Sequence, residues 1–135
     1  MQTAVSFTDT VETQEVLALY AANGWSSAQK PRQLLDGLRN SHSLVTARVD
    51  GRLVGIGNAI SDGFLVVYFP HLLVHPDFHR QGLGRKMMEV LLARYRSFHQ
   101  LMLTADGGAV DFYKSLGFER AGKTLPMWIY SGGDH

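Results

Sequence analysis

The chain has 135 residues, of which 45% are hydrophobic and 19% are charged, and its formal net charge is +1. This length and composition suit one domain with a hydrophobic core, and the balanced charge lacks the basic excess typical of nucleic-acid binding. The absence of cysteine excludes disulfide scaffolds, thiolate metal sites and a cysteine nucleophile.

Targeting signals are not apparent in the sequence. Residues 1–14 lack a basic region followed by an apolar run, and no apolar stretch approaches the roughly 18 residues that a transmembrane helix needs. We therefore expect a cytoplasmic protein that binds neither membrane nor nucleic acid. Residues 1–130 are predicted to form a single domain, and residues 131–135 a disordered tail.

Two helices are predicted first, at residues 13–23 and 31–40. Apolar side chains recur in both at helical spacing. Gly24 is a plausible stop for the first helix, and Pro31 suits the first turn of the second.

The hydrophobic period then changes to that of strands. Residues 43–49, 52–61 and 64–74 are strand-like, and Asp50-Gly51 and Asp62-Gly63 between them are typical of two-residue hairpin turns. These segments predict a three-stranded antiparallel meander. Because its third strand is nearly all apolar, we expect that strand to be covered on both faces.

The last part of the chain returns to alternating elements. An amphipathic helix is predicted at residues 84–96, a strand at 100–104, a short helix at 109–116, and closing strands at 118–121 and 127–130. The resulting order ααβββαβαββ predicts an α/β fold of the α+β type, built around one mostly antiparallel sheet.

The loop after Val74 has the features of an anion site. Pro76 ends the buried strand, and Gly82 and Gly84 then lead directly into the amphipathic helix. The first turn of a helix has free N–H groups and the positive end of the helix dipole, and glycine lets a ligand approach them. A tight strand-to-helix turn without a ligand is the plain alternative. Three basic residues in the same stretch favour a phosphate site: Arg80, Arg85 and Lys86.

Two nucleotide-binding patterns fit less well. The dinucleotide fingerprint needs a third glycine where the chain has Met87. Residues 117–124 match GxxxxGKT, but they follow a helix rather than a buried strand, and too little chain remains after them for a nucleotide-binding core. Neither pattern supports a nucleoside triphosphate site.

Two motifs together resemble the GNAT acetyltransferase superfamily. Residues 73–84 resemble its acetyl-CoA pyrophosphate loop, and residues 109–118 resemble its A-x-x-x-Y-x-x-x-G-F helix and following strand. His79 departs from the usual Gln or Arg, and Asp106 from a common Asn. The resemblance implies the GNAT fold, with six to seven strands and about four helices, and acetyl-CoA as cosubstrate. The residues that it implies for binding acetyl-CoA are Leu72, Leu73, Val74, His79, Arg80, Gln81, Gly82, Leu83, Gly84, Arg85, Asp106, Phe112 and Tyr113.

The same resemblance implies a mechanism without a metal. An amine attacks the thioester directly, a backbone N–H near Leu72 stabilises the oxyanion, and Tyr113 protonates the departing thiolate. His71 and Tyr68 are the candidates for the base. Without the resemblance, the residue pattern around Tyr113 favours a core aromatic, and His71 is more often a structural histidine. The three histidines spaced by four predict no metal site, because Pro76 breaks any helix that would align them.

Candidate acceptor contacts are aromatic: Trp25, Phe64 and Trp128. They favour a small primary amine, and the chain most resembles small arylalkylamine (serotonin-type) acetyltransferases of cyanobacterial and plant kind. Ordinary core or lid positions explain such aromatics equally well. Two other functions remain open, a non-catalytic acyl-CoA sensor and a protein or peptide N-acetyltransferase, and the sequence leaves a homodimer open as well.

Overall fold

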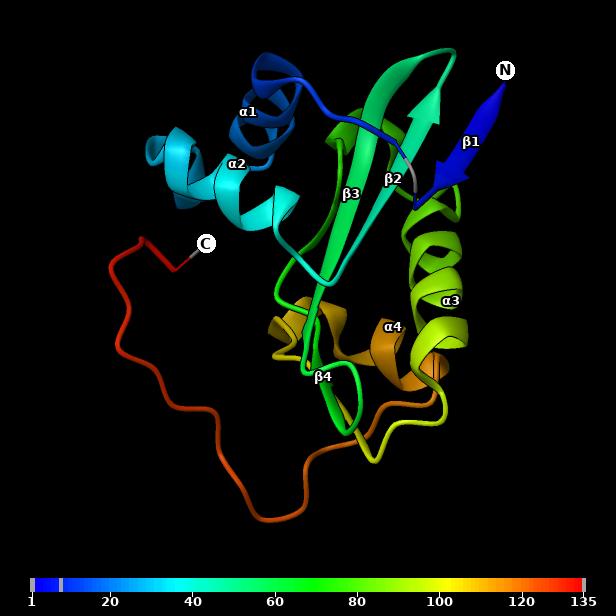
Figure 1. The fold of residues 1–135 in the computed structure, drawn as a ribbon, viewed down its shortest axis with the longest axis vertical. Helices are drawn as coiled ribbons and strands as arrows, with labels where there is room; N and C mark the ends of the chain where they lie inside the picture. Colours follow the sequence, from blue (N-terminus) through cyan, green and yellow to red (C-terminus); the bar gives the residue numbers. More distant parts are fainter. Residues whose placement is uncertain (1, 8, 135) are drawn as a thin grey trace.

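The computed structural model describes residues 2–7 and 9–134, which form one six-stranded sheet with helices on both faces (Figure 1). Three short 3₁₀ helices (η1–η3) join the larger elements. In chain order the elements are β1 (Thr3–Ser6), α1 (Thr13–Ala22), η1 (Ser26–Gln29), α2 (Pro31–Arg39), β2 (Ser43–Val49), β3 (Arg52–Ser61), β4 (Val66–Tyr68), β5 (Leu72–Val74), η2 (Pro76–Phe78), α3 (Leu83–Tyr95), β6 (Gln100–Met102), η3 (Gly107–Ala109) and α4 (Val110–Ser115).

The sheet is mixed and mostly antiparallel, as predicted. Its strand order is β1-β2-β3-β4-β6, with β5 paired separately to β3, and only the β4–β6 pair is parallel. The turn between β2 and β3 has positive φ at both Asp50 and Gly51, which confirms the first predicted hairpin. The fold class, the six strands and the four α-helices agree with the sequence-based expectation.

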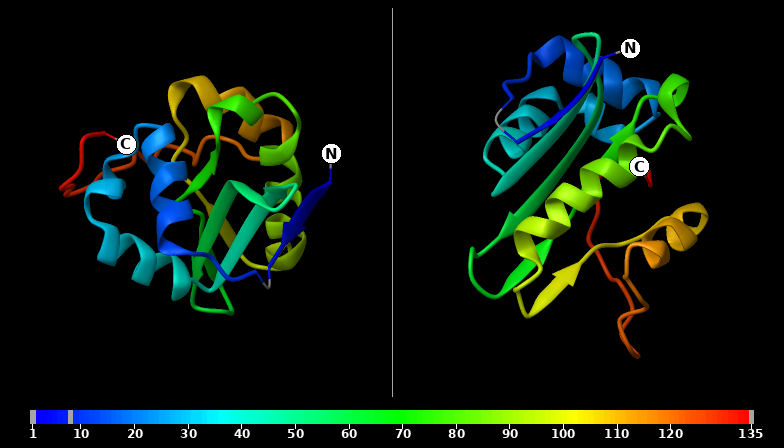
Figure 2. Two further views of the ribbon diagram at one scale, coloured as in Figure 1. Left: turned by 90° about the horizontal axis from the view of Figure 1, so that it is seen from above. Right: turned by 90° about the vertical axis from the view of Figure 1, so that its right-hand side faces the viewer.

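Helices cover both faces of this sheet (Figure 2), and a hydrophobic cluster lies on each face. On one face α3 packs through Met87 and Leu91, both fully buried. On the other face α1 and α2 cover Ile56, which is also fully buried. Burying a large apolar side chain contributes roughly 1.5–3 kcal/mol, so these two clusters supply most of the driving force for folding.

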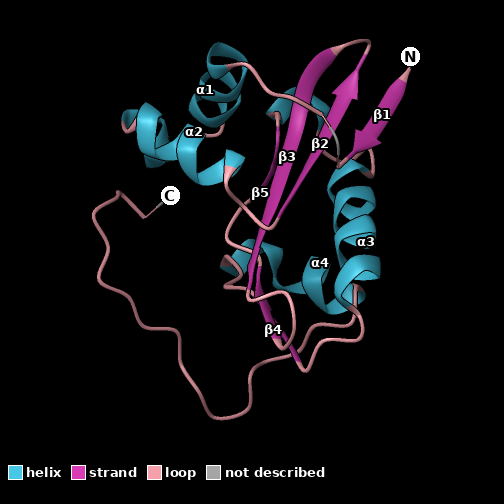
Figure 3. Ribbon diagram, in the orientation of Figure 1, coloured by secondary structure: helices cyan, strands magenta, loops and turns pink. Residues whose placement is uncertain are grey.

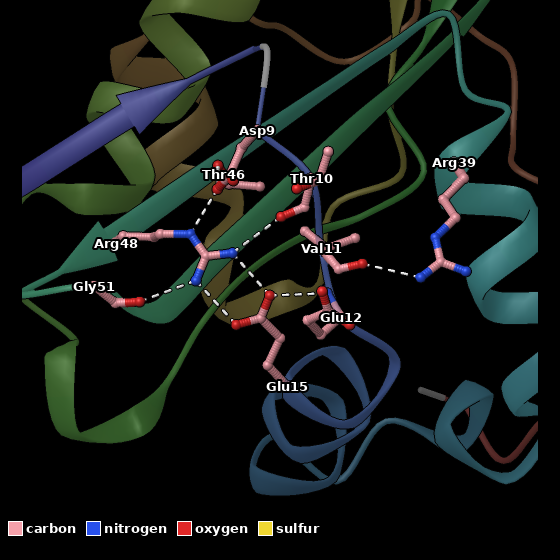
Figure 4. Close-up of polar contacts among 9 residues, drawn as sticks. All are labelled: Asp9, Thr10, Val11, Glu12, Glu15, Arg39, Thr46, Arg48 and Gly51. Carbon is pink, nitrogen blue, oxygen red and sulfur yellow. Dashed lines mark hydrogen bonds and ion pairs between the residues drawn. The ribbon is translucent and has the colours of Figure 1, made fainter.

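The strand β1, which pairs antiparallel with β2, was not predicted from the sequence. The segment after β1 is held by Arg48 of β2, whose guanidinium binds Asp9 at 2.6 Å and Glu15 of α1 at 2.8 Å (Figure 4). Hydrogen bonds from Arg48 lower the pKa of Glu15. Burial acts to raise the pKa of Asp9, but hydrogen bonds from Arg48 and Thr46 outweigh it and lower the value. These contacts join the N-terminal segment, α1 and the sheet.

The prediction of one continuous strand at residues 64–74 is wrong. The structure has two short strands, β4 and β5, separated by residues 69–71. Pro70 has no N–H to donate to a ladder, which interrupts the strand at this point. The prediction that this strand is covered on both faces is also wrong for β4, since Val66 and Tyr68 are exposed and only Val67 is buried.

Two further expectations differ from the structure. The second turn is longer than two residues, because the Asp62 carboxylate accepts hydrogen bonds from the amides of residues 64–66 and holds them in a loop. The closing strands predicted at residues 118–121 and 127–130 are absent from the described part of the chain, which has no strand after β6 (Figure 3). The predicted disordered tail at 131–135 stays a prediction; residues 131–134 have neither helix nor strand, and His135 lies outside the described residues.

Candidate functional site

The loop between β5 and α3 has the backbone geometry of an anion site. Arg80 and Gly82 both have positive φ, 63° and 80°, and Gly82 caps the first turn of α3. Alternating backbone handedness of this kind turns successive N–H groups toward one concave face. The first intrahelical bond runs from Lys86 N–H to Gly82 C=O, and within residues 2–7 and 9–134 no acceptor is found for the N–H groups of residues 80–85.

The two loop glycines leave space beside these amides. A Cβ at Gly82 would meet no atom within 4 Å, and one at Gly84 would make only ordinary contacts, at 3.8 Å from Phe112 and Val74. Packing within the chain therefore does not require glycine at Gly84. Free amides, positive φ and open space beside them fit a phosphate group.

The side chains of this loop differ in what they can offer a ligand. His79 folds back onto β5, with its Nε2 2.7 Å from the carbonyl oxygen of Val74. Arg85 bonds to Ser115 Oγ at 2.9 Å and to Glu89 at 3.2 Å, so it ties α3 to α4. Leu83 is buried in the core, so only its backbone faces the loop. The exposed side chains of Arg80 and Gln81 remain accessible to an anion.

The edge of β5 provides a second set of backbone groups. Asn58 N–H donates to the carbonyl of His71, and His75 N–H donates to that of Val54. Because bonded pairs alternate along an antiparallel ladder, Leu73 also bonds to β3, while Leu72 and Val74 direct their N–H and C=O groups away from it. The backbone groups of Leu73 are therefore bonded to β3, and its side chain is buried.

The outer edge of β5 faces a gap in the sheet. The strand β6 pairs with β4, and the last bond, from Phe69 N–H to Met102 C=O, comes before β5 begins. β5 pairs with β3 alone. β6 thus separates from β5, and the free groups of Leu72 lie where the two strands diverge.

A cavity of about 820 Å³ lies at this divergence. It brings together residues from four segments that are distant in the sequence, and Tyr68, His71, Leu72, Asp106 and Tyr113 all line it. Trp25 and Trp128 also line it. Phe64, also expected at the acceptor site, does not line this cavity and is 88% exposed in the turn before β4.

His71 is held in a fixed position in the wall of this cavity. Its Nδ1 lies 2.7 Å from the hydroxyl oxygen of Tyr20, and its ring meets Trp25 edge-on with centroids 5.1 Å apart. Burial lowers the pKa of His71 to about 4, so its imidazole is neutral at pH 7. A neutral imidazole can accept a proton.

Two residues that support His71 were missed by the sequence analysis. Tyr20 is fully buried in α1, where its helical spacing indicated only a core position, and burial raises its pKa. Asn58 of β3 accepts from His71 N–H through its side chain at 3.1 Å, and its backbone N–H donates to His71 C=O. A buried Asn within an apolar strand was the available signal for this role.

Tyr113 of α4 lines the same cavity. Its ring packs edge-on against Phe112 and Phe118, with centroids 5.0 and 5.9 Å apart. Burial, aided by the negative charge of Asp106, raises the pKa of Tyr113 to about 12. The phenol is therefore protonated at pH 7 and able to donate its proton.

The acceptor side of the cavity is aromatic. The rings of Trp128 and Tyr130 stack in parallel at 4.3 Å, and Gly133 N–H donates to Ser26 Oγ at 3.0 Å. The second contact places the C-terminal segment beside η1. Lys30 and Asp134 add one charge of each sign to the same rim.

The three histidines spaced by four have separate partners. His71 bonds to Tyr20, His75 lies near Arg52 and Asp77, and His79 bonds to Val74. No group of three or more metal-ligating side chains occurs among the residues that the structure describes. Over the same residues, no helix combines the length and the apolar character needed to cross a bilayer.

Comparison with known proteins gives consistent matches. The family model of the acetyltransferase (GNAT) domain matches residues 8–126. A solved GNAT-family acetyltransferase from Streptococcus pneumoniae TIGR4 is similar with a TM-score of 0.83 and 29% identity, over 96% of this chain and 98% of that one.

Curated relatives match over shorter stretches. An uncharacterised N-acetyltransferase, ycf52, of Gracilaria tenuistipitata var. liui is 38% identical over 68 residues, which are 49% of this chain and 37% of that protein. A protein of Glycine max named histone acetyltransferase TAP1 is 34% identical over 87 residues, 63% of this chain and 37% of that one. The match thus spans well under two thirds of the length of either relative.

Proposed function

Because the chain belongs to the GNAT acetyltransferase family, we propose that it transfers an acetyl group from acetyl-CoA to the nitrogen of a small primary amine. The observation that carries this proposal is the cavity where His71, the outward edge of β5 at Leu72 and Tyr113 meet. These groups correspond to a base, an oxyanion donor and an acid. The free amides of residues 80–85 lie at the other end of β5 and suit the diphosphate of coenzyme A.

The chemistry follows from these positions. The amine nitrogen attacks the thioester carbon, and the N–H of Leu72 stabilises the negative charge that develops on the carbonyl oxygen, a contribution of about 3 kcal/mol in other enzymes. As the carbon–sulfur bond breaks, the Tyr113 hydroxyl donates its proton to the sulfur. The nitrogen becomes acidic once the new carbon–nitrogen bond has formed, and His71 accepts the proton that it loses.

This role sets a requirement on the His71 tautomer. Its Nδ1 contacts Tyr20, so only Nε2 is left to accept a proton. For Nε2 to be unprotonated, Nδ1–H must donate to the Tyr20 hydroxyl oxygen. The ¹⁵N chemical shifts of the His71 ring at pH 7 should therefore show the Nδ1–H tautomer. The opposite tautomer would remove His71 as the base and leave Tyr68 as the alternative on the same wall.

The aromatic walls favour an amine with an aryl or apolar body. Trp25, Tyr68 and Trp128 offer ring faces, while the carboxylates of Asp106 and Asp134 attract the cationic form of the amine before it loses a proton. A protein lysine is the second candidate, because the soybean relative is named a histone acetyltransferase.

Thiol release from acetyl-CoA tests the activity directly, and the chain has no cysteine to react with the thiol reagent. The panel comprises arylalkylamines, polyamines, amino acids and a histone tail peptide. We expect the fastest release with an arylalkylamine; fastest release with the peptide would favour the lysine acceptor. Calorimetric binding of acetyl-CoA without release on any acceptor would instead indicate a sensor, and no binding at all would overturn the proposal.

A glycine variant tests the phosphate loop separately. Gly84→Ala adds a methyl group that this chain accommodates at ordinary contact distance. It should weaken acetyl-CoA binding at least several-fold, because the methyl group takes the space of a phosphate oxygen, while the melting temperature stays unchanged. Gly37→Ala on α2 is the matched control, since its Cβ would meet nothing within 4 Å and lies outside the loop.

A further inference from the structure

Lys30 has a backbone that is held in place and a side chain that is not. It lies at the junction of η1 and α2, where its N–H donates to the carbonyl of Ser27 and its own carbonyl accepts from Leu34 N–H, both at 3.0 Å. The residue is exposed, and within residues 2–7 and 9–134 no hydrogen bond or ion pair is found for its side-chain nitrogen. The four-carbon stem therefore lets the amine move while its point of attachment stays fixed.

This point of attachment lies beside His71. The cavity of the candidate site and a second cavity of about 220 Å³ have three lining residues in common, Ser27, Lys30 and His71. Lys30 and His71 therefore lie where the two cavities adjoin. Leu72 and Tyr113 also line the larger cavity, so the Lys30 amine opens onto the space where the thioester would meet its acceptor.

No other lysine of the chain has this position. The chain has four lysines, and the other three are Lys86, Lys114 and Lys123. All four are exposed, but only Lys30 lines either cavity. A reagent in solution thus reaches all four amines, whereas a thioester bound in the larger cavity faces only Lys30.

We propose that the chain acetylates itself on the amine of Lys30. This inference rests on the proposed function, because it uses the same bound acetyl-CoA in the same cavity. The unprotonated Nζ attacks the thioester carbon, so that a carbon–nitrogen bond forms and the carbon–sulfur bond breaks. His71 accepts the proton that the nitrogen loses, and Tyr113 donates its proton to the sulfur. The products are Nε-acetyl-Lys30 and the free thiol of coenzyme A, and solvent returns the proton from His71 to Tyr113.

The modification changes the charge that an acceptor meets. Three charged side chains line the larger cavity, those of Lys30, Asp106 and Asp134. Acetylation removes the positive charge of the lysine and leaves the two carboxylates. The acetylated enzyme should therefore attract a cationic amine more strongly, and its own lysine no longer competes for the acetyl group.

Mass spectrometry with deuterated acetyl-CoA tests the proposal on the full chain. Prior treatment with a lysine deacetylase frees any amine acetylated during expression, and chymotryptic peptides then compare the four lysines. At a saturating concentration of acetyl-CoA, Lys30 should gain label roughly 10-fold faster than each of the other three, because a thioester bound beside the amine has a high effective concentration. Since the reaction occurs within one chain, its rate constant should not change when the protein is diluted.

Two controls separate catalysis at Lys30 from chemical labelling. Lys30→Arg keeps the charge and removes the acceptor, so the fast labelling should disappear, whereas the matched variant Lys123→Arg should leave the Lys30 rate unchanged. Desulfo-coenzyme A, which lacks the thiol, should compete for the cofactor site and slow the labelling of Lys30 alone. Labelling of Lys30 no faster than that of the other lysines, or labelling that desulfo-coenzyme A leaves unchanged, overturns the proposal.

The thiol-release panel distinguishes this failure from a failure of the proposed function. Thiol release with an external amine, in a chain that leaves Lys30 unlabelled, refutes self-acetylation alone. The absence of both thiol release and label refutes both proposals.

Discussion

The described residues up to Tyr95 and those after it bury their side chains very differently. All the buried residues among them lie at or before Tyr95, and the hydrophobic ones form the two clusters on either side of the sheet. After Tyr95 every described residue is exposed or only partly buried, yet this part contributes Asp106, Tyr113 and Trp128 to the cavity. The first region therefore supplies most of the stability, and the second supplies reactive and acceptor-facing groups on a more exposed framework.

Such a division follows from what each region must do. A core needs close packing on all sides, whereas a site must leave room for substrates and expose polar groups to them. The C-terminal region can remain more open because every buried member of the two clusters comes from the first region, and side chains such as Leu101, Phe112 and Phe118 pack against them only partly buried. Four changes test this comparison, from the largest expected effect to the smallest.

Tyr113→Phe should affect turnover and spare stability. Removing the hydroxyl removes the proton donor for the departing thiolate, so kcat should fall roughly 100-fold or more, with the KM for acetyl-CoA little changed. The ring contacts with Phe112 and Phe118 persist, so the melting temperature should hold. Steady-state kinetics and thermal melts measure the two effects; an unaltered kcat would exclude Tyr113 as the acid.

Leu91→Ala should have the opposite effect. Leu91 is fully buried on α3, and its truncation should lower the free energy of unfolding by roughly 2–5 kcal/mol. Leu125→Ala, at a position 71% exposed, should change it by about 0.5 kcal/mol or less. Urea unfolding compares the two. Similar losses at both positions would show that the C-terminal region contributes to the core after all.

Acid should destabilise the first region through His71. Its pKa is about 4 in the folded protein and near the ordinary 6.5 when unfolded, so the unfolded chain binds the proton more tightly between these values. The contribution of the neutral imidazole is complete above pH 6.5 and is lost as the pH falls to 4, a change on the order of 3 kcal/mol. In urea unfolding from pH 7 to 4, His71→Gln should lack this part of the decline. A variant whose stability falls as steeply as that of the wild type would contradict the burial of a neutral His71.

Arg48→Met tests how strongly the N-terminal segment is held. The guanidinium and its two carboxylate partners are only partly exposed, so leaving the carboxylates without a cation should cost about 1–2 kcal/mol after solvent screening. The loss should be smaller in high salt. Arg32→Met, an exposed arginine on α2, serves as the control and should change little. An equally small effect at Arg48 would mean that β1 pairing alone fixes the segment.

Local signals predicted the elements of the first region well. The helices α1 and α2 and the strands β2 and β3 lie at their predicted positions to within one residue at each end. Their hydrophobic periods, turn residues and helix-ending residues are all set by neighbouring residues in the chain. The glycine loop was also recognisable, since its spacing and its position before a helix are local properties. The assignments that failed depend on distant partners, among them the closing strands at 118–121 and 127–130.

The support around His71 could not be derived from the sequence. Tyr20, Asn58 and Trp25 come from α1, β3 and the loop after α1, and no spacing rule relates these positions to His71. Arg48 similarly binds two carboxylates more than thirty residues away in the chain. Such contacts arise only when separate elements pack.

By itself the sequence determined the fold class, the helices and paired strands of the first region, and the loop at Gly82 and Gly84, because hydrophobic period and turn chemistry act between near neighbours. Only the tertiary structure decided that β5 leaves Leu72 facing the gap beside β6, and that His71 is neutral beside Tyr20. It also decided that the apolar residues near the C-terminus stay exposed instead of closing the sheet. Strand partners and burial depend on contacts between segments far apart in the chain, and a pattern within one segment does not specify them.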